Sequence, residues 1–383
     1  MSDKVKKILF VAHMDSHIAN FHIPYLKWFK DQGYETHVAS NSLESTKQIL
    51  YCDYKHQINF LRSPFSLKNI KVYKEFKKLI KENKFCLVHA HTPMGGLIAR
   101  LALRNKNIPV IYTAHGFHFL KGGSKLSWLL FYPIEKYLSK YTNELITINH
   151  EDYTLAISKF SKNCQISYVP GVGINLNEYY KIEDNQKDEI RKSLNLSKDD
   201  FVILYVAELT EGKNQSFLIN MIYELKLKYN NLKLLLVGYG KEKEKYIDLI
   251  KKLNLENEVK ILGYRKDILE LNNIADLVVS SSKREGLPRS LLESLSIGKP
   301  LLVSNIRGNN DTVIDGVNGF LFQLDNKEMF AKCFDILYNN KETRNNFSIE
   351  SQKLVKKYDL NIVLGQVGDI YRKYLKEGDK IER

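Results

Sequence analysis

The sequence predicts an α/β protein of two Rossmann-like domains facing each other across a cleft, with helices at its C-terminal end. Short apolar runs alternate with amphipathic helical patterns along most of the 383 residues, which is typical of parallel sheets covered by helices. A polar stretch at about residues 174–200 interrupts this alternation and separates two sets of similar size. After residue 322 only helical patterns remain. In such sheets, ligands bind at the carboxyl ends of the strands.

The first set of elements defines a domain over residues 1–180. Apolar runs of four to six residues predict strands, and apolar residues spaced three and four apart predict helices. The expected strands are 8–12, 35–39, 56–60, 86–90, 109–113, 145–149 and 165–169, and the expected helices are 18–29, 67–84, 93–104, 127–141 and 151–160.

The second set follows a linker expected at residues 181–200 and defines a domain over residues 201–355. The expected strands are 201–206, 232–237, 259–262, 277–280 and 300–304, and the expected helices are 214–229, 241–253, 267–273 and 289–297. The last segment, 356–383, is expected to be a helix that packs back toward the first domain.

The charge is unevenly distributed. Residues 1–180 carry 24 Lys and Arg against 13 Asp and Glu, whereas residues 181–383 carry 34 against 31. A basic first half indicates a polyanionic partner, either nucleic acid or an anionic membrane. The helix expected at 67–84 carries seven lysines, either as a solvated outer face or for membrane contact. No nucleic-acid reader motif is present, so we expect no nucleic-acid partner.

The remaining composition indicates a cytoplasmic protein. The four cysteines are scattered, without metal-ligand spacing. No signal peptide or membrane-spanning run is recognisable. We therefore expect a cytoplasmic protein, and the basic first half favours a position at the inner face of the cell membrane.

The most informative stretch is 280–300. Glu285 and Gly286 form a turn after an apolar strand, and Pro288 suits the first turn of the helix that follows. The N–H groups from Gly286 to Ser290, including that of Leu287, would form an anion site at the helix N-terminus. With Glu293 inside the helix, two acids flank this site. A phosphate between hydroxyl-rich groups, as in a nucleotide-sugar, fits the pattern.

Three further loops at the same edge supply compatible residues. Lys213 follows the first strand of the second domain, where it could neutralise a diphosphate. Gly238 and Gly240 follow the next strand and permit close backbone approach to a ligand. Gly263 and Tyr264 repeat this arrangement one strand later and could hold a base through main-chain groups.

These motifs resemble the retaining glycosyltransferases of the GT-B fold, family 4. The first half is similar to the subgroup that builds capsular and exopolysaccharide repeat units. The motifs that carry the resemblance are Lys213-Asn214, Val237-Gly-Tyr-Gly240, Gly263-Tyr-Arg265, Glu285 with Glu293, Gly316-Val-Asn-Gly319, Ser16-His-Ile-Ala-Asn-Phe-His-Ile-Pro24, His89-Ala-His-Thr-Pro93, Tyr112-Thr-Ala-His-Gly-Phe-His118 and Ile146-Thr-Ile-Asn-His-Glu-Asp152.

The resemblance assigns roles to individual residues. It implies that Lys213 contacts the donor diphosphate, that Glu285 faces the donor sugar and that Glu293 holds the ribose hydroxyls. His115 would lie beside the reacting sugar carbon, which makes His115, Glu285 and Lys213 the candidate catalytic residues. Many members carry Gly-Arg-Leu where this chain has Ala207-Glu208-Leu209, so a second cation on the diphosphate is missing. The candidates to replace it are Arg284, Arg289 and Arg307.

Histidines 13, 17, 22, 89, 91, 115 and 118 fall at loop ends of the first domain. For His89 and His118 we favour structural hydrogen-bonding roles. Asn20 and His22 are candidate acceptor contacts.

The expected activity is transfer of a hexose or N-acetylhexosamine from a UDP-sugar to a polyprenyl-diphosphate-linked saccharide, with retention of anomeric configuration. No Asp-x-Asp motif is present, and the adjacent Asp199 and Asp200 fit a surface turn, so we expect a metal-independent enzyme without a cofactor. The alternatives are another GT-B nucleotide-sugar enzyme, of epimerase or phosphorylase type, and a basic nucleic-acid-binding protein.

Overall fold

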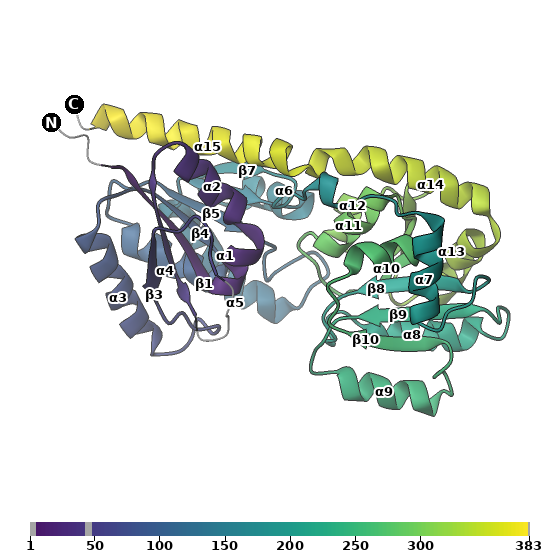
Figure 1. Cartoon of the computed structure of the whole chain (residues 1–383). Helices are drawn as coiled ribbons and strands as arrows, with labels where there is room; N and C mark the ends of the chain where they lie inside the picture. The colour runs from purple at the N-terminus through teal and green to yellow at the C-terminus, as the bar shows by residue number, and fades with distance from the viewer. Residues whose placement is uncertain (1–4, 43–47, 382–383) are drawn as a thin grey trace. The chain divides into compact units, whose positions relative to one another are not determined.

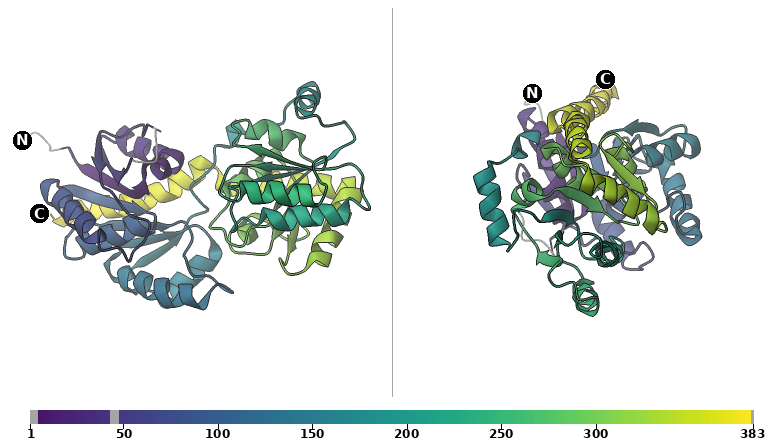
Figure 2. Two further views of the ribbon diagram at one scale, coloured as in Figure 1. Left: turned by 90° about the horizontal axis from the view of Figure 1, so that it is seen from below. Right: turned by 90° about the vertical axis from the view of Figure 1, so that its right-hand side faces the viewer.

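The computed structural model describes residues 5–42 and 48–381, with side chains through Leu375. Contacts divide the chain into two units. The first unit extends to Gly173 and also includes residues 361–383; the second covers Ile174–Leu360. Helices lie on both faces of the sheet in each unit (Figures 1 and 2).

The first unit contains a seven-stranded sheet in the order β3-β2-β1-β4-β5-β6-β7. All neighbouring strands are parallel. The strands are β1 (Lys7–Met14), β2 (Glu35–Asn41), β3 (Tyr54–Gln57), β4 (Phe85–His91), β5 (Val110–Ala114), β6 (Glu144–Thr147) and β7 (Gln165–Tyr168). The strand order reverses between β1 and β4, which is where ligands bind in folds of this kind.

Seven helices cover this sheet, within the described residues: α1 (Asp15–Phe21), α2 (Ile23–Asp31), α3 (Asn69–Glu82), α4 (Pro93–Leu103), α5 (Lys125–Leu138), α6 (His150–Lys159) and α15 (Leu360–Ile381). The single helix expected at 18–29 is wrong, because the structure has two helices there. Pro24 has no N–H to donate and its ring clashes with the carbonyl four residues earlier, so α1 ends before it. α15 packs on α2 (Figure 1), and the rings of Trp28 and Tyr371 lie 5.3 Å apart.

The second unit contains a six-stranded parallel sheet in the order β10-β9-β8-β11-β12-β13. Its strands are β8 (Phe201–Val206), β9 (Leu232–Val237), β10 (Val259–Gly263), β11 (Leu277–Ser280), β12 (Leu301–Ser304) and β13 (Gly319–Phe322). Its helices are α7 (Asp184–Ser193), α8 (Gln215–Leu225), α9 (Lys243–Lys252), α10 (Ile268–Ile274), α11 (Arg289–Ile297), α12 (Asn309–Thr312), α13 (Lys327–Asn339) and α14 (Lys341–Leu354). Short 3₁₀ helices occur at Ser139–Tyr141, Leu176–Glu178 and Val355–Tyr358.

The segment expected to be a linker, 181–200, has a different structure. It contains α7 and belongs to the second unit. Arg191 anchors it by donating to the carbonyls of Ser197 (3.1 Å) and Ile274 (2.9 Å). The polar composition of this segment reflects a helix on the surface of the unit, and the chain changes unit earlier, after Gly173.

Candidate functional site

The site expected around Glu285 forms where the second sheet reverses its strand order, between β8 and β11. Lys213 follows β8 and Glu285 follows β11. The Lys213 Nζ donates to Glu285 Oε1 at 2.5 Å, and Ser282 Oγ donates to the same oxygen at 2.6 Å. The Lys213 side chain is 27% exposed and that of Glu285 is 11% exposed. The Lys213 ammonium group is therefore held at the carboxyl edge of the sheet, where ligands bind, and remains partly accessible to solvent.

A buried tyrosine, Tyr205, hydrogen-bonds to the loops that carry Lys213 and Glu285. The sequence analysis did not single it out. The Tyr205 hydroxyl donates to the Lys213 carbonyl at 2.9 Å and lies 2.8 Å from Ser282 Oγ. Burial raises the pKa of Tyr205 well above its usual range, so its phenol stays neutral and remains a donor. Ser281 Oγ adds a 2.8 Å bond to the Asn214 carbonyl. These bonds fix the backbone that carries Lys213 and Glu285.

Helix α11 begins directly after this loop, as the sequence predicted. Glu293 lies in its second turn and is mostly buried, with 13% of its side chain exposed. Its Oε1 accepts from Tyr179 Oη at 2.9 Å and from Arg289 Nε at 3.1 Å. Burial raises the pKa of Glu293, and the neighbouring Arg289 opposes that shift. Leu287 packs against the core on this side of the sheet.

Gly308 packs so closely against the loop of Glu285 that a side chain at this position would overlap with it. Arg307 Nε donates to the Glu285 carbonyl at 3.0 Å. Gly308 has a φ of +83°, and a Cβ at that position would lie 2.6 Å from the Gly286 carbonyl oxygen. Gly308 therefore supports the loop that carries Glu285 and Gly286.

The glycine loops after β9 and β10 lie at the same edge. A Cβ on Gly238 would lie 2.1 Å from the Ala207 carbonyl oxygen, and the Gly238 N–H donates to the Gly263 carbonyl at 2.8 Å. Tyr264 is 63% exposed and Tyr239 is 66% exposed, with ring centroids 6.1 Å apart. Two exposed aromatic rings side by side form an apolar surface at this edge; Tyr239 was not singled out by the sequence analysis.

The three arginines considered as the second cation have different surroundings. Arg284 is exposed, Arg289 pairs with Glu293, and Arg307 is 4% exposed and bonds the Glu285 backbone. Glu208 itself is exposed.

In the first unit, four of the histidines come together near the strand-order reversal between β1 and β4. His17 lies in α1, His22 between α1 and α2, His91 at the end of β4 and His115 directly after β5. His17 Nε2 and His115 Nε2 are 3.3 Å apart, and His115 Nε2 and His91 Nδ1 are 3.5 Å apart. The rings of His22 and His91 stack with centroids 3.7 Å apart.

Burial sets the charge of these imidazoles. It lowers the pKa of His115 to about 4, and it lowers those of His17, His22 and His91 well below the usual value. All four are therefore neutral at pH 7, since removal from water disfavours the imidazolium. His89 is also buried, but its two nitrogens contact Tyr371 Oη (2.7 Å) and Thr113 Oγ1 (2.8 Å).

The other histidines and Asn20 are placed as follows. His13 and His118 both line a cavity of about 380 Å³ in the first unit. The rest of its wall is largely apolar and includes Met94, Leu97, Phe117, Phe119 and Phe131, with Arg62 as a cation and Glu135 as an acid. Asn20 is exposed near the end of α1.

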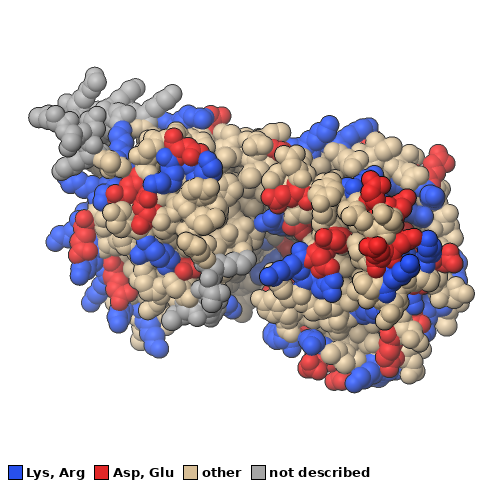
Figure 3. Space-filling view, viewed as in Figure 1, with Lys and Arg blue, Asp and Glu red and all other residues tan. Residues whose placement is uncertain are grey.

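The outer face of α3 is basic and has apolar residues before and in its first turn. Its lysines are exposed, whereas Val72, Phe76 and Ile80 are buried. Blue Lys and Arg side chains are spread over the left side of the view in Figure 3, where α3 lies in Figure 1. Phe65 is 62% exposed and Leu67 is 84% exposed. Among the described residues, we find no helix long and apolar enough to span a bilayer.

Both units match known families. Residues 186–354 match Glycosyl transferases group 1, and residues 7–149 match Glycosyl transferase 4-like. The chain is 39% identical over 373 residues to the putative glycosyltransferase EpsD of Bacillus subtilis, covering 97% of each chain. The chain belongs to these glycosyltransferases.

Two further similarities bear on this glycosyltransferase. It is 29% identical over 321 residues to an Escherichia coli UDP-Gal:α-D-GlcNAc-diphosphoundecaprenol α-1,3-galactosyltransferase, covering 80% of this chain and 82% of that protein. Its fold matches the crystal structure of Anabaena HepE in complex with UDP and glucose, with a TM-score of 0.80 and 20% identity, over 96% of this chain and 100% of that one. The GT-B fold is thus confirmed, and the epimerase, phosphorylase and nucleic-acid-binding alternatives are not supported.

Proposed function

We propose that this glycosyltransferase moves a hexose or N-acetylhexosamine from a UDP-sugar to a polyprenyl-diphosphate-linked saccharide, with retention of anomeric configuration. The observation that carries the proposal is the pairing of Lys213 with Glu285 at the start of α11, with Glu293 eight residues further on. A partly accessible cation, a helix N-terminus and two acids suit a diphosphate between a sugar and a ribose.

Glu285 forms an ion pair with Lys213 and balances its charge. In the proposed reaction the donor diphosphate takes over Lys213, and this leaves the Glu285 carboxylate free to accept from sugar hydroxyls. Cleavage of the bond to the anomeric carbon places negative charge on the leaving phosphate oxygen. Lys213 and the N–H groups at the start of α11 would then stabilise charge that develops in the transition state, where stabilisation accelerates the reaction.

The nucleoside would occupy the loops beside this centre. Glu293 would accept from the ribose hydroxyls, in place of its present bonds from Tyr179 and Arg289. Gly238 and Gly263 allow backbone approach to the base, and Tyr264 offers an exposed ring beside it.

We propose that the diphosphate is bound without a metal ion or cofactor. Asp200 Oδ2 accepts from the Ser197 N–H at 2.7 Å in a turn before β8. This bond and the exposed position of Asp199 suit a surface turn. In retention, the leaving phosphate would accept the proton of the incoming hydroxyl on the same face of the sugar.

The first unit would bind the acceptor. The apolar cavity suits the first isoprene units of a prenyl chain, and Arg62 in its wall suits the diphosphate. The similar Escherichia coli protein acts on a diphosphoundecaprenol-linked acceptor. We propose Asn20 and His22 as acceptor contacts and His115 as the catalytic residue nearest the reacting sugar.

The face of α3 would bring the enzyme to the inner surface of the cell membrane. Exposed lysines attract anionic lipid, at about 1 kcal/mol for each residue near the surface. Exposed Phe65, Leu67 and Ile70 would insert among the headgroups. Enzyme and lipid-linked acceptor would thus meet at one surface.

A substrate panel tests the proposal. The enzyme is incubated with UDP-sugars and a bacterial membrane lipid extract, and UDP release and labelled glycolipid are measured, with and without chelator. We expect one donor to yield a glycolipid that retains the anomeric configuration, at equal rates in both conditions. Inversion would refute the proposed stereochemistry, and inactivity with chelator, in protein that held no transition-metal ion beforehand, would refute metal-independent binding of the diphosphate. If no UDP-sugar yields product, the proposed donor class is wrong.

A further inference from the structure

Four imidazoles of the first unit have ligand nitrogens that all lie within 4.8 Å of one another: those of His17, His22, His91 and His115. They come from α1, the α1–α2 junction, the end of β4 and the residue after β5. Because β1, β4 and β5 are neighbours in the sheet, hydrogen-bonded strands hold this histidine cluster in place. A preformed set of ligands on rigid elements is what a metal site requires.

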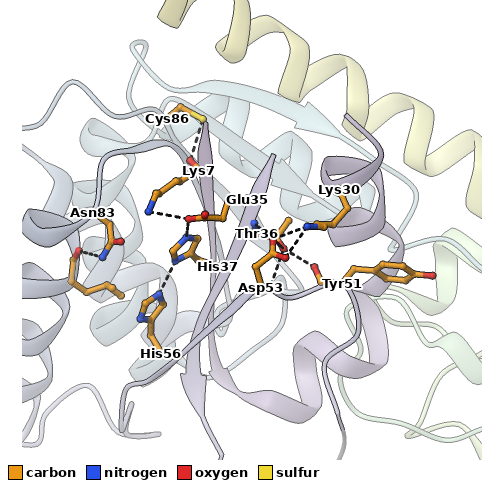
Figure 4. A network of polar contacts seen from close by, with 11 residues as sticks. Lys7, Lys30, Glu35, Thr36, His37, Tyr51, Asp53, His56, Asn83 and Cys86 are labelled. Carbon is orange, nitrogen blue, oxygen red and sulfur yellow. Dashed lines mark hydrogen bonds and ion pairs between the residues drawn. The ribbon is translucent and has the colours of Figure 1, made fainter. Parts of the chain in front are cut away.

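Two nitrogen separations within the histidine cluster are longer than the distance in a short histidine–histidine hydrogen bond. This chain supplies such a bond for comparison, because His37 Nδ1 and His56 Nε2 are 2.8 Å apart (Figure 4). In the cluster the nitrogen separations are 3.3 Å between His17 and His115 and 3.5 Å between His115 and His91. Two imidazoles on one tetrahedral ion, with Zn–N distances of about 2.0–2.1 Å, have nitrogens about 3.3–3.4 Å apart.

Two nitrogens of the histidine cluster are buried without a hydrogen-bond partner, His22 Nε2 and His91 Nε2. Leaving a buried polar atom unsatisfied costs about 1–3 kcal/mol, so His22 Nε2 favours a ligand at this site, whereas His91 presents its other nitrogen, Nδ1, to His115. His89 lies beside the cluster, but Tyr371 and Thr113 already occupy both of its nitrogens. It is therefore excluded as a ligand.

We propose that His17, His22, His91 and His115 bind one divalent transition-metal ion of the Zn²⁺ class. Imidazole nitrogen is a good ligand for Zn²⁺, Co²⁺, Ni²⁺ and Cu²⁺, whereas Mg²⁺ and Ca²⁺ require oxygen ligands, which this set lacks. The ion would join α1, the α1–α2 junction and the edge of the sheet.

This inference goes beyond the proposed function. The metal independence proposed above concerns the donor diphosphate in the second unit, whereas the histidine cluster lies in the first and includes His22 and His115. Because chelator would also remove an ion from these two residues, the metal content of the protein is measured beside the transfer assay. Metal content and optical spectra are measured here, and sugar transfer is not, so failure of one proposal is distinguishable from failure of the other.

The test uses the full-length protein, stripped with chelator and dialysed. Titration with Co²⁺ is followed by its visible absorption bands, and bound Zn²⁺ is measured by elemental analysis after gel filtration. We expect one ion per chain, with bands typical of tetrahedral nitrogen ligation. His22→Ala and His91→Ala should each weaken Co²⁺ binding about 100-fold or more, since even loss of an outer-shell partner costs 10–100-fold.

His56→Ala is the matched control, because it removes a half-buried histidine that pairs with another histidine outside the cluster. It should leave Co²⁺ binding unchanged. Circular dichroism in chelator confirms that each variant is folded, and the partly exposed His17→Asn replaces any variant that is not. Absence of Co²⁺ and Zn²⁺ binding to the folded wild-type protein would overturn the proposal, as would equal loss of binding in His56→Ala.

Discussion

Gly308→Ala should damage the donor site, although Gly308 itself is not among the residues proposed to contact the donor. The added Cβ would lie 2.6 Å from the Gly286 carbonyl oxygen and 3.1 Å from the Glu285 Cβ. Because the closest atom belongs to the backbone, no side-chain rotation relieves the overlap. Ordinary contact begins at 3.4 Å, so the loop must move by about 0.8 Å.

Two effects of this substitution can be separated. Gly308 has a φ of +83° and a ψ of −45°, a sparsely populated region that costs a residue with a side chain about 1–3 kcal/mol. Gly316→Ala is the matched control, because its φ is +74° but its Cβ would meet nothing within 4 Å. Each kcal/mol lowers the Tm of a unit of this size by roughly 2–4 °C. The overlap with Gly286 is present only in Gly308→Ala, and a displacement near 1 Å can lower turnover about 100-fold.

The assay combines thermal unfolding, UDP binding by calorimetry and UDP release from the donor. Gly316→Ala should lose a few degrees and keep its UDP affinity and turnover. Gly308→Ala should lose more stability, bind UDP at least about tenfold more weakly and turn over up to about 100-fold more slowly. If Gly308→Ala binds UDP and turns over like Gly316→Ala, the loop that carries Glu285 is not part of the donor site.

Three further substitutions test other parts of the account. Lys213→Ala should lower turnover about 10²–10³-fold. Lys283→Ala should not, because Lys283 lies in the loop of Glu285 but is 48% exposed. Equal turnover of the two variants in steady-state assays would exclude Lys213 from catalysis. Because burial raises the pKa of Glu293, its ionised form opposes folding once the pH exceeds the unfolded value near 4.5. Glu293→Gln should therefore raise the Tm at pH 7, do so less at pH 4, and weaken UDP binding; a lower Tm at pH 7 would contradict this reasoning. Replacing Lys74 and Lys77 together by alanine should weaken binding to anionic vesicles roughly 30-fold, from about 1 kcal/mol each, and leave the weak binding to neutral vesicles unchanged; undiminished sedimentation with anionic vesicles would refute the membrane role of α3.

The sequence predicted the alternation of strands and helices well, because buried parallel strands are short apolar runs that stand out from amphipathic helices. It also predicted that Glu285 lies in a loop and Glu293 in the following helix. The sequence could not predict the order of the strands within each sheet. Lys213 follows the first strand of its set and Glu285 the fourth, and they meet only because β8 and β11 are neighbours.

The same limit explains the residues that were missed. Tyr179 comes from a polar stretch assigned to a domain boundary, yet it bonds Glu293 across 114 residues of sequence. The sequence placed several histidines at loop ends but gave no sign that four sets of ring nitrogens converge. The prediction also failed at α7, because this charged helix has no buried residue and its sequence resembles that of a polar linker.

The central claim is that the second unit binds a nucleoside diphosphate at Lys213 and the start of α11. Calorimetric titration of the intact enzyme with UDP, UDP-sugars, GDP and GDP-sugars tests it most directly. We expect saturable binding of UDP with one site per chain, lost in Lys213→Ala and preserved in Lys283→Ala. If the folded wild-type enzyme binds none of these nucleotides, the claim is contradicted.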